Sequence, residues 1–129
     1  MHTGPLPTGL VISEAYTEHL TGQGHPEQPG RVTAIVERLK ADGLFDRASV
    51  IAPRAVGDEE LLRCHSPAYL RIVHEDVAEG LHRLSTGDTQ LSPRSLEIAR
   101  LASGGLLAAC SSGGYVHLWA RDAASAVVA

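Results

Sequence analysis

Two short apolar runs and one segment of helical periodicity dominate the first half of the chain. Leu10–Ile12 and Ser49–Ala52 are short and contain β-branched residues, so both are expected to be strands. Between them, Pro29–Ala41 carries apolar side chains at i, i+3, i+4 and i+7 and is followed by Gly43, which suits a helix end. This strand–helix–strand order predicts two parallel strands joined by a helical crossover.

The second half of the chain is predicted to be mainly helical. A short helix is expected at Asp58–Glu60, another from Ser66-Pro67, and a longer one from Ser92-Pro93 whose second half is rich in small residues. The small residues are expected to allow close packing on a sheet or on a neighbouring helix. The helix after Ser66 carries an apolar stripe that consists of Leu70, Val73, Val77 and Leu81.

Polar, turn-rich segments separate these elements. Ser13–Gly24 and Ser85–Gln90 are expected to be loops, and Tyr115–Trp119 is a further candidate strand. Strands that alternate with helices along a chain favour an α/β fold.

The composition is that of a globular protein without an electrostatic affinity for nucleic acid. Of 129 residues, 43% are hydrophobic and 20% charged, and the formal net charge is −4, so one domain is the default. No apolar run approaches the ~18 residues that span a bilayer, and the first residues lack the features of a secretory leader. With only two cysteines, the chain is expected to be a cytoplasmic protein with neither nucleic-acid nor membrane partners.

The stretch from Gly24 to Arg31, GHPEQPGR, combines a rigid loop with an unusual first helical turn. Pro26 and Pro29 each fix φ and lack an N–H, so residues 24–30 are expected to form a stiff loop. Arg31 places a cation at the positive end of the helix dipole, where it is locally unfavourable. Because local rules are most often broken at functional sites, Arg31 is a candidate site residue.

Three stretches in register resemble one known family. The segment from His25 to Arg31, HPEQPGR, resembles the N-terminal signature of the histone deacetylase family, and is closest to its bacterial and class II branch, which includes acetylpolyamine and acetoin-utilisation deacetylases. The segment HSPAYL at residues 65–70 is similar to a helix start of that family, and residues 87–95 are similar to its second active-site loop. The resemblance covers about residues 10–109.

The resemblance implies an α/β architecture: the N-terminal portion of a three-layer arginase/deacetylase-type fold with a parallel sheet. Residues 1–9 are then a loose arm, residues 10–110 the N-terminal part of a deacetylase-like domain, and residues 111–129 a divergent tail. The family's activity is zinc-dependent hydrolysis of an acetyl-amide, in acetyl-lysine of a protein or in an acetylpolyamine. The family's zinc ligands, catalytic His pair and active-site Tyr have no counterparts here, so no catalytic residue and no metal ligand is assigned, and tight zinc binding is not expected.

Two residues carry site assignments, each with a plainer alternative. Asp88 is either a turn aspartate that binds nearby backbone N–H groups or, as the resemblance implies, a carboxylate at the channel rim that binds the substrate's amides. Arg31 is either solvated or paired with Glu27 or, as the resemblance implies, lies beside the internal cavity through which acetate leaves. The implied roles place Asp88 and the loop before Arg31 on one face, with Asp88 partly exposed and Arg31 more buried.

The other histidines and the first cysteine are given structural roles. His74-Glu75 lacks the second His of an H-E-x-x-H site, and His82 lies two helical turns away, so surface positions are the better explanation. His25 and Glu27 are expected to shape their loop, and Cys64 is expected to be a small core residue.

The chain is therefore interpreted as the N-terminal part of a zinc-dependent deacetylase that is inactive by itself. One alternative is a non-catalytic binding module that keeps the substrate-loop surface, and another is the non-functional product of an interrupted gene. The reading frames beyond residue 129 would distinguish these interpretations.

Overall fold

The computed structural model describes residues 9–111, in which two strands and five helical segments follow one another. In chain order they are β1 Gly9–Val11, the 3-10 helix η1 Glu14–Glu18, α1 Pro29–Ala41, β2 Ser49–Ile51, α2 Asp58–Leu61, α3 Pro67–Ala78 and α4 Ser95–Ser111. The expected N-terminal arm, the tail and the strand at Tyr115–Trp119 lie almost entirely outside the described residues.

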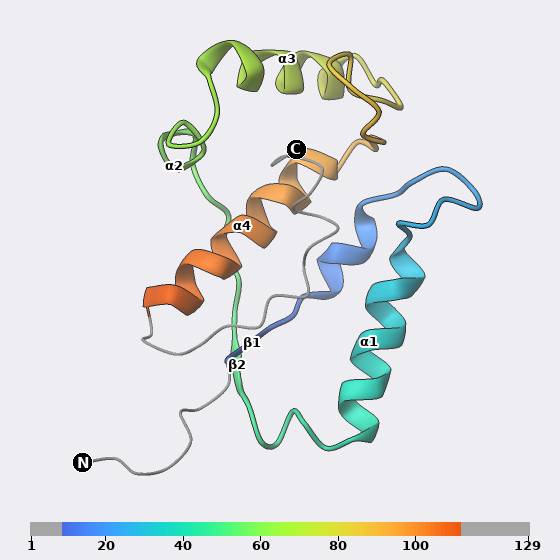
Figure 1. Ribbon diagram of the computed structural model, residues 1–129, viewed down its shortest axis with the longest axis vertical. Helices are drawn as coiled ribbons and strands as arrows, with labels where there is room; N and C mark the ends of the chain where they lie inside the picture. The colour runs from blue at the N-terminus through green and yellow to red at the C-terminus, as the bar shows by residue number, and fades with distance from the viewer. Residues whose placement is uncertain (1–8, 112–129) are drawn as a thin grey trace.

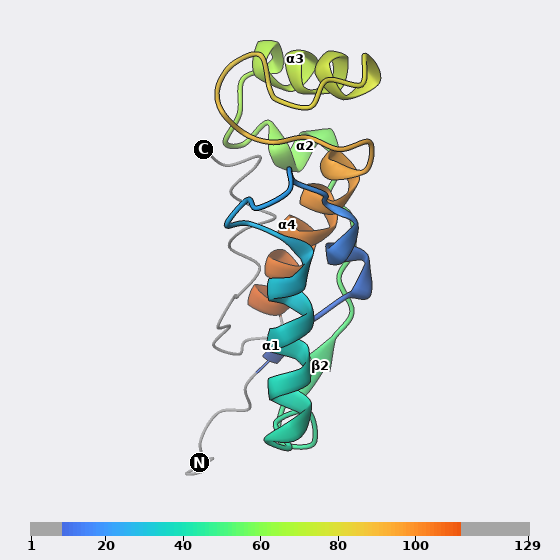
Figure 2. The same cartoon turned by 90° about the vertical axis from the view of Figure 1, so that its right-hand side faces the viewer.

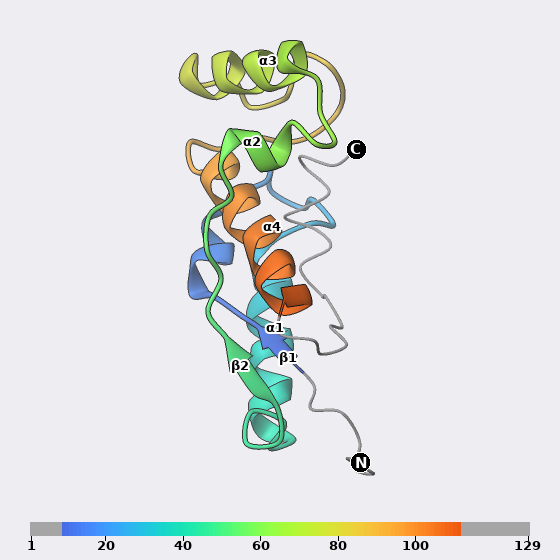
Figure 3. The same cartoon turned by 90° about the vertical axis from the view of Figure 1, so that its left-hand side faces the viewer.

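β1 and β2 form a two-stranded parallel sheet, as the strand–helix–strand order predicted. Leu10 pairs with Val50 and Val11 pairs with Ile51, and the connection between the strands contains η1 and α1. α4 packs on both strands and on η1, while α1 packs on η1 (Figure 1 and Figure 3). The predicted α/β class with a parallel sheet is therefore confirmed.

α1 begins and ends where the sequence predicted. Pro29 occupies the first turn, where a missing N–H is tolerated. At the other end Gly43 adopts φ +64°, its N–H donates to Lys40 O at 3.1 Å, and the N–H of Leu44 donates to Leu39 O at 3.0 Å. This pair of bonds is the Schellman arrangement, which explains why a glycine follows the helix.

The segment Ser13–Gly24 is not the plain loop that its polarity predicted. Ser13 accepts a hydrogen bond from Ala15 N at 3.3 Å and caps η1. Tyr16 on η1 is buried against Ile98 and Ala102 of α4. The prediction was wrong because one aromatic anchor, rather than a periodic apolar stripe, holds this short helix in place.

Two helix boundaries also differ from the prediction. α4 begins at Ser95 rather than at Ser92-Pro93, because Ser92 Oγ accepts from Leu20 N at 3.0 Å and serves a tertiary contact instead of a helix cap. Leu81, placed by its spacing on the apolar stripe of α3, lies beyond the end of that helix and is 38% exposed. Gly80, with φ +74°, turns the chain away before Leu81.

Small residues bring the backbone of α4 close to the strand segments, as predicted. A Cβ on Gly104 would lie 1.5 Å from Arg54 O, and a Cβ on Gly105 would lie 2.5 Å from Val11 Cγ1. Arg54 follows β2 and Val11 belongs to β1. Side chains larger than hydrogen therefore do not fit where α4 crosses these segments.

Buried apolar side chains of the described residues form three separate clusters. One joins η1 to α4, one joins α2 to α3, and one packs α3 against the segment between α3 and α4. Their members are Tyr16, Ile98 and Ala102; Val56, Leu61 and Leu70; and Val73, Leu84 and Leu91. α1 has no buried residue, and Val50 of β2 is 56% exposed. Within residues 9–111, no helix is both long enough and apolar enough to cross a membrane.

Candidate functional site

Asp88 lies near the tip of a hairpin-like segment between α3 and α4, which we call the Asp88 hairpin, residues 82–91. Leu84 N donates to Thr89 O at 2.9 Å, and Leu91 N donates to His82 O at 3.0 Å, so the two arms are held together. Asp88 is exposed, which agrees with the partial exposure expected of it. Its carboxylate is therefore accessible to a hydrogen-bond donor from outside the chain.

The start of the Asp88 hairpin is anchored on α3 by Asp76, which is 6% exposed. The carboxylate of Asp76 accepts hydrogen bonds from Ser85 N at 2.7 Å and from Ser85 Oγ at 2.9 Å and 3.1 Å. Hydrogen bonds to an ionised acceptor are stronger than those between neutral groups. Leu84 and Leu91 pack on Val73 of the same helix, so charge and apolar burial together fix the hairpin.

The loop between η1 and α1, residues 19–28, is shaped by its own side chains. His25 Nδ1 accepts a hydrogen bond from Glu27 N at 3.1 Å, and Thr21 Oγ1 donates to Glu27 O. His25 N donates to Gly22 O at 3.0 Å. His25 and Glu27 thus have the loop-shaping contacts expected of them.

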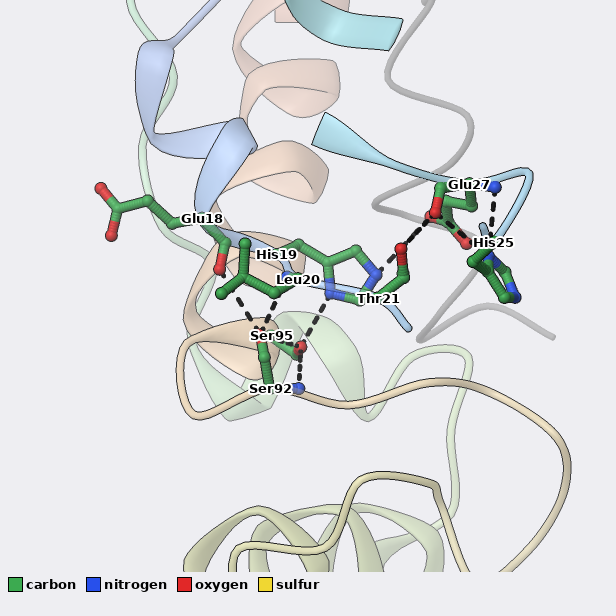
Figure 4. A network of polar contacts seen from close by, with 8 residues as sticks. All are labelled: Glu18, His19, Leu20, Thr21, His25, Glu27, Ser92 and Ser95. Carbon is green, nitrogen blue, oxygen red and sulfur yellow. Dashed lines mark hydrogen bonds and ion pairs between the residues drawn. The ribbon is translucent and has the colours of Figure 1, made fainter. Parts of the chain in front are cut away.

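These two loops meet at the N-terminal end of α4 (Figure 4). Leu20 N donates to Ser92 Oγ at 3.0 Å, and Ser92 Oγ donates to Glu18 O at 3.4 Å. A Cβ on Gly22 would lie 4.0 Å from Gln90 Oε1. Figure 1 and Figure 2 show the blue loop 19–28 and the yellow-orange hairpin on the same side of the molecule. The loop before Arg31 and the segment with Asp88 therefore lie side by side, as the resemblance implied.

His19 lies at this junction and is only 5% exposed. Its Nδ1 lies 2.7 Å from Ser95 Oγ, and the same oxygen accepts a hydrogen bond from Ser92 N at 2.7 Å. On the other side of the ring, Nε2 lies 3.7 Å from Glu27 Oε1. One imidazole therefore connects the first residue of α4 with the loop 19–28 (Figure 4).

The surroundings of His19 favour its neutral form. Burial lowers the pKa of His19 below 6.5, and the nearby charge of His25 lowers this pKa further. The Glu27 carboxylate favours a proton on Nε2, which leaves Nδ1 as the acceptor for the Ser95 hydroxyl. Every hydroxyl and N–H of the junction then has one acceptor.

Ser95, His19 and Glu27 are the residue types of a hydrolytic triad, but they are not arranged as a catalytic one. Ser95 is 3% exposed, and its Oγ is already bonded to Ser92 N. A nucleophilic serine must reach the substrate carbonyl, which this burial prevents. The arrangement can hold backbone segments in place but cannot attack an amide.

Arg31 does not occupy the buried position that the resemblance implied. It lies in the first turn of α1, where its N–H donates to Gln28 O at 3.0 Å, and the residue is exposed. The expectation of burial was wrong for the described structure, because α1 contributes no buried residue at all. Exposure also weakens the dipole penalty, since solvent screens it.

The described residues do not fit a catalytic zinc site. Within residues 9–111 there is no group of three or more His, Cys, Asp or Glu side chains that could hold a metal ion, whereas a catalytic zinc needs three protein ligands. His74 and His82 are exposed, as predicted, and His74 Nε2 accepts a hydrogen bond from Arg100 at 3.1 Å. Cys64 is exposed, not in the core as predicted, because it lies in the turn that follows α2.

The sequence interpretation missed His19, Ser95 and Asp76, although two of them carry a signal. Asp76 falls three residues after Val73 on the buried side of α3, and His19 falls three residues after the buried Tyr16. A polar residue in line with buried positions indicates a side chain that has found a partner. Ser95 carries no such signal, because its role depends on contacts far away in the sequence.

Comparison with known proteins identifies the family. The family model described as histone deacetylase domain matches residues 25–126. The chain belongs to the histone deacetylase family, as its motifs predicted.

The relatives found by sequence are deacetylases or related proteins. The chain is 35% identical to human polyamine deacetylase HDAC10 over 108 residues, which cover 77% of this chain and 16% of the relative. It is 30% identical to the acetoin utilization protein AcuC of Bacillus subtilis over 107 residues, 78% of this chain and 28% of the relative. A probable deacetylase of Archaeoglobus fulgidus is 27% identical over 109 residues, 83% of this chain and 30% of that protein.

A solved structure has the same fold over the shared part. The crystal structure of the HDA15 HD domain superimposes with a TM-score of 0.75 at 26% identity, and the match covers 87% of this chain and 34% of that one. The chain therefore spans about a third or less of the proteins that it matches.

Proposed function

We propose that this chain supplies the N-terminal part of a zinc-dependent deacetylase domain that hydrolyses an acetyl-amide, in acetyl-lysine or in an acetylpolyamine. The loop 19–28 and the Asp88 hairpin form part of the substrate channel. Zinc would activate the water that attacks the carbonyl, and its ligands and the catalytic His pair are not supplied by this chain. The chain alone is therefore inactive.

The observation that carries this proposal is the direct hydrogen bonding between the two loops. They are more than sixty residues apart in sequence, yet Leu20 N and Ser92 Oγ are 3.0 Å apart. A substrate that spans two loops is bound well only when their relative position is set in advance, because ordering them on binding costs free energy. The buried contacts at Ser92 and Ser95 provide that preorganisation.

Asp88 is proposed to bind the amide groups of the substrate. It is exposed on a hairpin whose start is anchored through Asp76 and whose end is anchored through Ser92. Hydrogen bonds to an ionised acceptor contribute about 1.5–3 kcal/mol each. Loss of the charge should therefore weaken transition-state binding by roughly 10- to 100-fold.

Arg31 is proposed to bind the departing acetate, since a guanidinium matches the geometry of a carboxylate. Arg31 is exposed, so this role requires a further part of the domain to cover α1. The half-buried apolar side chains of α1 offer a surface for that packing: Val32, Ile35, Val36 and Leu39.

The first experiment assays the purified 129-residue chain with acetyl-lysine peptides and acetylpolyamines, with added zinc and with a chelator. We expect no turnover in either condition, because the described residues hold no set of metal ligands. Chelator-sensitive deacetylation by the chain alone would overturn the proposal.

The second experiment tests the channel role in an active context. Residues of AcuC from Bacillus subtilis that match this chain are replaced by those of this chain, and kcat/KM is measured on both substrate classes. We expect an active chimera in which Asp88→Asn lowers kcat/KM by roughly 10- to 100-fold. The matched control is Asp46→Asn, an exposed aspartate in the loop between α1 and β2, which should have no effect.

The chimera also separates the proposal from a binding module. An active chimera that is indifferent to Asp88→Asn would remove the channel role of Asp88. An inactive but folded chimera, together with binding of an acetylated peptide by the 129-residue chain, would favour the non-catalytic module instead.

A further inference from the structure

We propose that His19 is a positioning residue that holds the loop 19–28 and the Asp88 hairpin in one fixed relative arrangement, through the hydrogen bond from Ser95 to its Nδ1. The importance of this arrangement for substrate binding rests on the proposed function. The arrangement itself does not, because it follows from contacts within the described residues.

His19 stands where three segments meet. It is the first residue after η1 and begins the loop 19–28. Ser95, its partner at 2.7 Å, is the first residue of α4. Ser92, which closes the Asp88 hairpin, donates its N–H to the same Ser95 oxygen at 2.7 Å. Ser95 Oγ therefore transmits the position of the imidazole to the end of the hairpin.

The chemistry of the junction explains why this position needs an acceptor. His19, Ser92 and Ser95 are each less than 9% exposed, so water cannot replace a lost partner. A buried donor without an acceptor bears the full cost of its desolvation. If Nδ1 were replaced by carbon, the Ser95 hydroxyl would have to turn towards Ser92, whose Oγ lies 3.0 Å away. That turn would disturb the bonds that Ser92 makes to Leu20 and Glu18.

A second interpretation is that His19 only fills space beside α4, and the two interpretations predict opposite effects of two substitutions. His19→Asn keeps an acceptor atom, Oδ1, near the position of Nδ1 but removes most of the ring. His19→Leu keeps an apolar side chain of comparable bulk but removes the acceptor. Positioning requires that Asn preserves the junction and Leu does not, while space filling requires the reverse.

The experiment measures hydrogen–deuterium exchange of the full chain at two reporter amides. These are the N–H of Leu20, bonded to Ser92 Oγ, and the N–H of Ser92, bonded to Ser95 Oγ. We expect protection of both amides in the wild type, near-wild-type protection in His19→Asn, and exchange roughly tenfold faster at both in His19→Leu. Unfolded-like exchange in the wild type, or a Leu variant better protected than the Asn variant, would overturn the proposal.

A measurement on the wild type keeps the test independent of variant folding. Nitrogen-15 NMR of the imidazole should show the neutral tautomer with its proton on Nε2 and with Nδ1 as acceptor. A proton on Nδ1 would overturn the assignment of the acceptor. The matched control is His82→Leu, an exposed histidine on the Asp88 hairpin itself, which should leave both reporter amides unchanged.

One further variant separates this proposal from the proposed function. Asp88→Asn should leave the exchange at Leu20 and Ser92 unchanged, because Asp88 is exposed and lies outside the junction. If the chimera ignores Asp88→Asn while His19→Leu still loosens both loops, the channel role fails and the positioning role of His19 stands.

Discussion

The two halves of α4 are held in place by different kinds of contact. At its N-terminal end, Ser95 lies in a buried network of directional hydrogen bonds with His19 and Ser92. Further along, Gly104 and Gly105 press bare backbone against the segments that form the sheet. The first half is fixed by partner chemistry and the second by shape.

The two halves also differ in how completely they are covered. The junction at Ser95 is closed to solvent, whereas the sheet has two strands, with Val50 56% exposed. Small sheets without further strands or apolar cover are only marginally stable. Directional bonds can therefore fix the geometry of the two loops in a chain whose sheet is still largely open. The comparison teaches that site geometry and sheet stability are separate properties here.

The largest expected effect is on the shape-dependent half, from Gly104→Ala. The added Cβ would lie 1.5 Å from Arg54 O, so α4 and the segment after β2 must separate. The same segment is tied to α4 by the bond from Val56 N to Arg100 O at 3.1 Å, so separation also strains that contact. We expect a loss of at least about 3 kcal/mol in the free energy of unfolding, measured by urea denaturation.

The control for Gly104→Ala is Gly30→Ala, the same change in another helix. No atom lies within 4 Å of the Cβ position at Gly30. This variant should be neutral or more stable by less than about 1 kcal/mol, because alanine reduces the freedom of the unfolded chain. Equal stability of the two variants would show that α4 does not cross Arg54 as closely as described.

The next effect is on the polar half, from Asp76→Ala. This change leaves the N–H and the hydroxyl of Ser85 without their buried acceptor. We expect a loss of about 2–3 kcal/mol in the free energy of unfolding and faster amide exchange along the Asp88 hairpin. The control is Asp42→Ala, which breaks an exposed pair with Arg38 and should cost less than about 1 kcal/mol. A similar cost for both variants would contradict the anchoring role of Asp76.

Local signals in the sequence were sufficient for most of the fold. The bounds of α1 follow from a proline, a periodic apolar stripe and a glycine, all within a few residues of one another. The parallel pairing of β1 with β2 follows from the helical connection between them. Closeness of α4 to the strands follows from its small residues.

The junction could not be predicted in the same way, because its contacts join residues far apart in the sequence. Ser92 and Pro93 have the local form of a helix start, yet Ser92 bonds to Leu20 and the helix begins at Ser95. His19 lies in a polar stretch that gives no sign of burial except its spacing from Tyr16. The burial expected of Arg31 came from the family resemblance and was wrong for the described residues, in which α1 stays uncovered.

The smallest expected effect concerns the charge of His19. Two titratable groups face its ring: the Glu27 carboxylate, 3.7 Å from Nε2, which favours the charged ring, and His25, which opposes it. Burial outweighs the attraction, so the pKa of His19 is lower in the folded chain than its ordinary 6.5. Carboxyl groups in the structure titrate at lower pH; a hydrogen bond from Arg54, for example, lowers the pKa of Glu60 to about 2.

The free energy of unfolding should therefore be highest above pH 6.5 and should fall as the pH drops from there through the lowered pKa of folded His19. In that range the unfolded chain carries a proton on this residue and the folded chain does not, so acid favours unfolding. The measurement is the urea midpoint from about pH 5 to about pH 8, for the wild type and for His19→Asn. The Asn variant keeps an acceptor for Ser95 but cannot titrate, so it should lose less stability on acidification than the wild type. A wild type and a variant with parallel pH profiles would show that the pKa of His19 is the same in the folded and unfolded chains, and that its burial at the end of η1 is not maintained in solution.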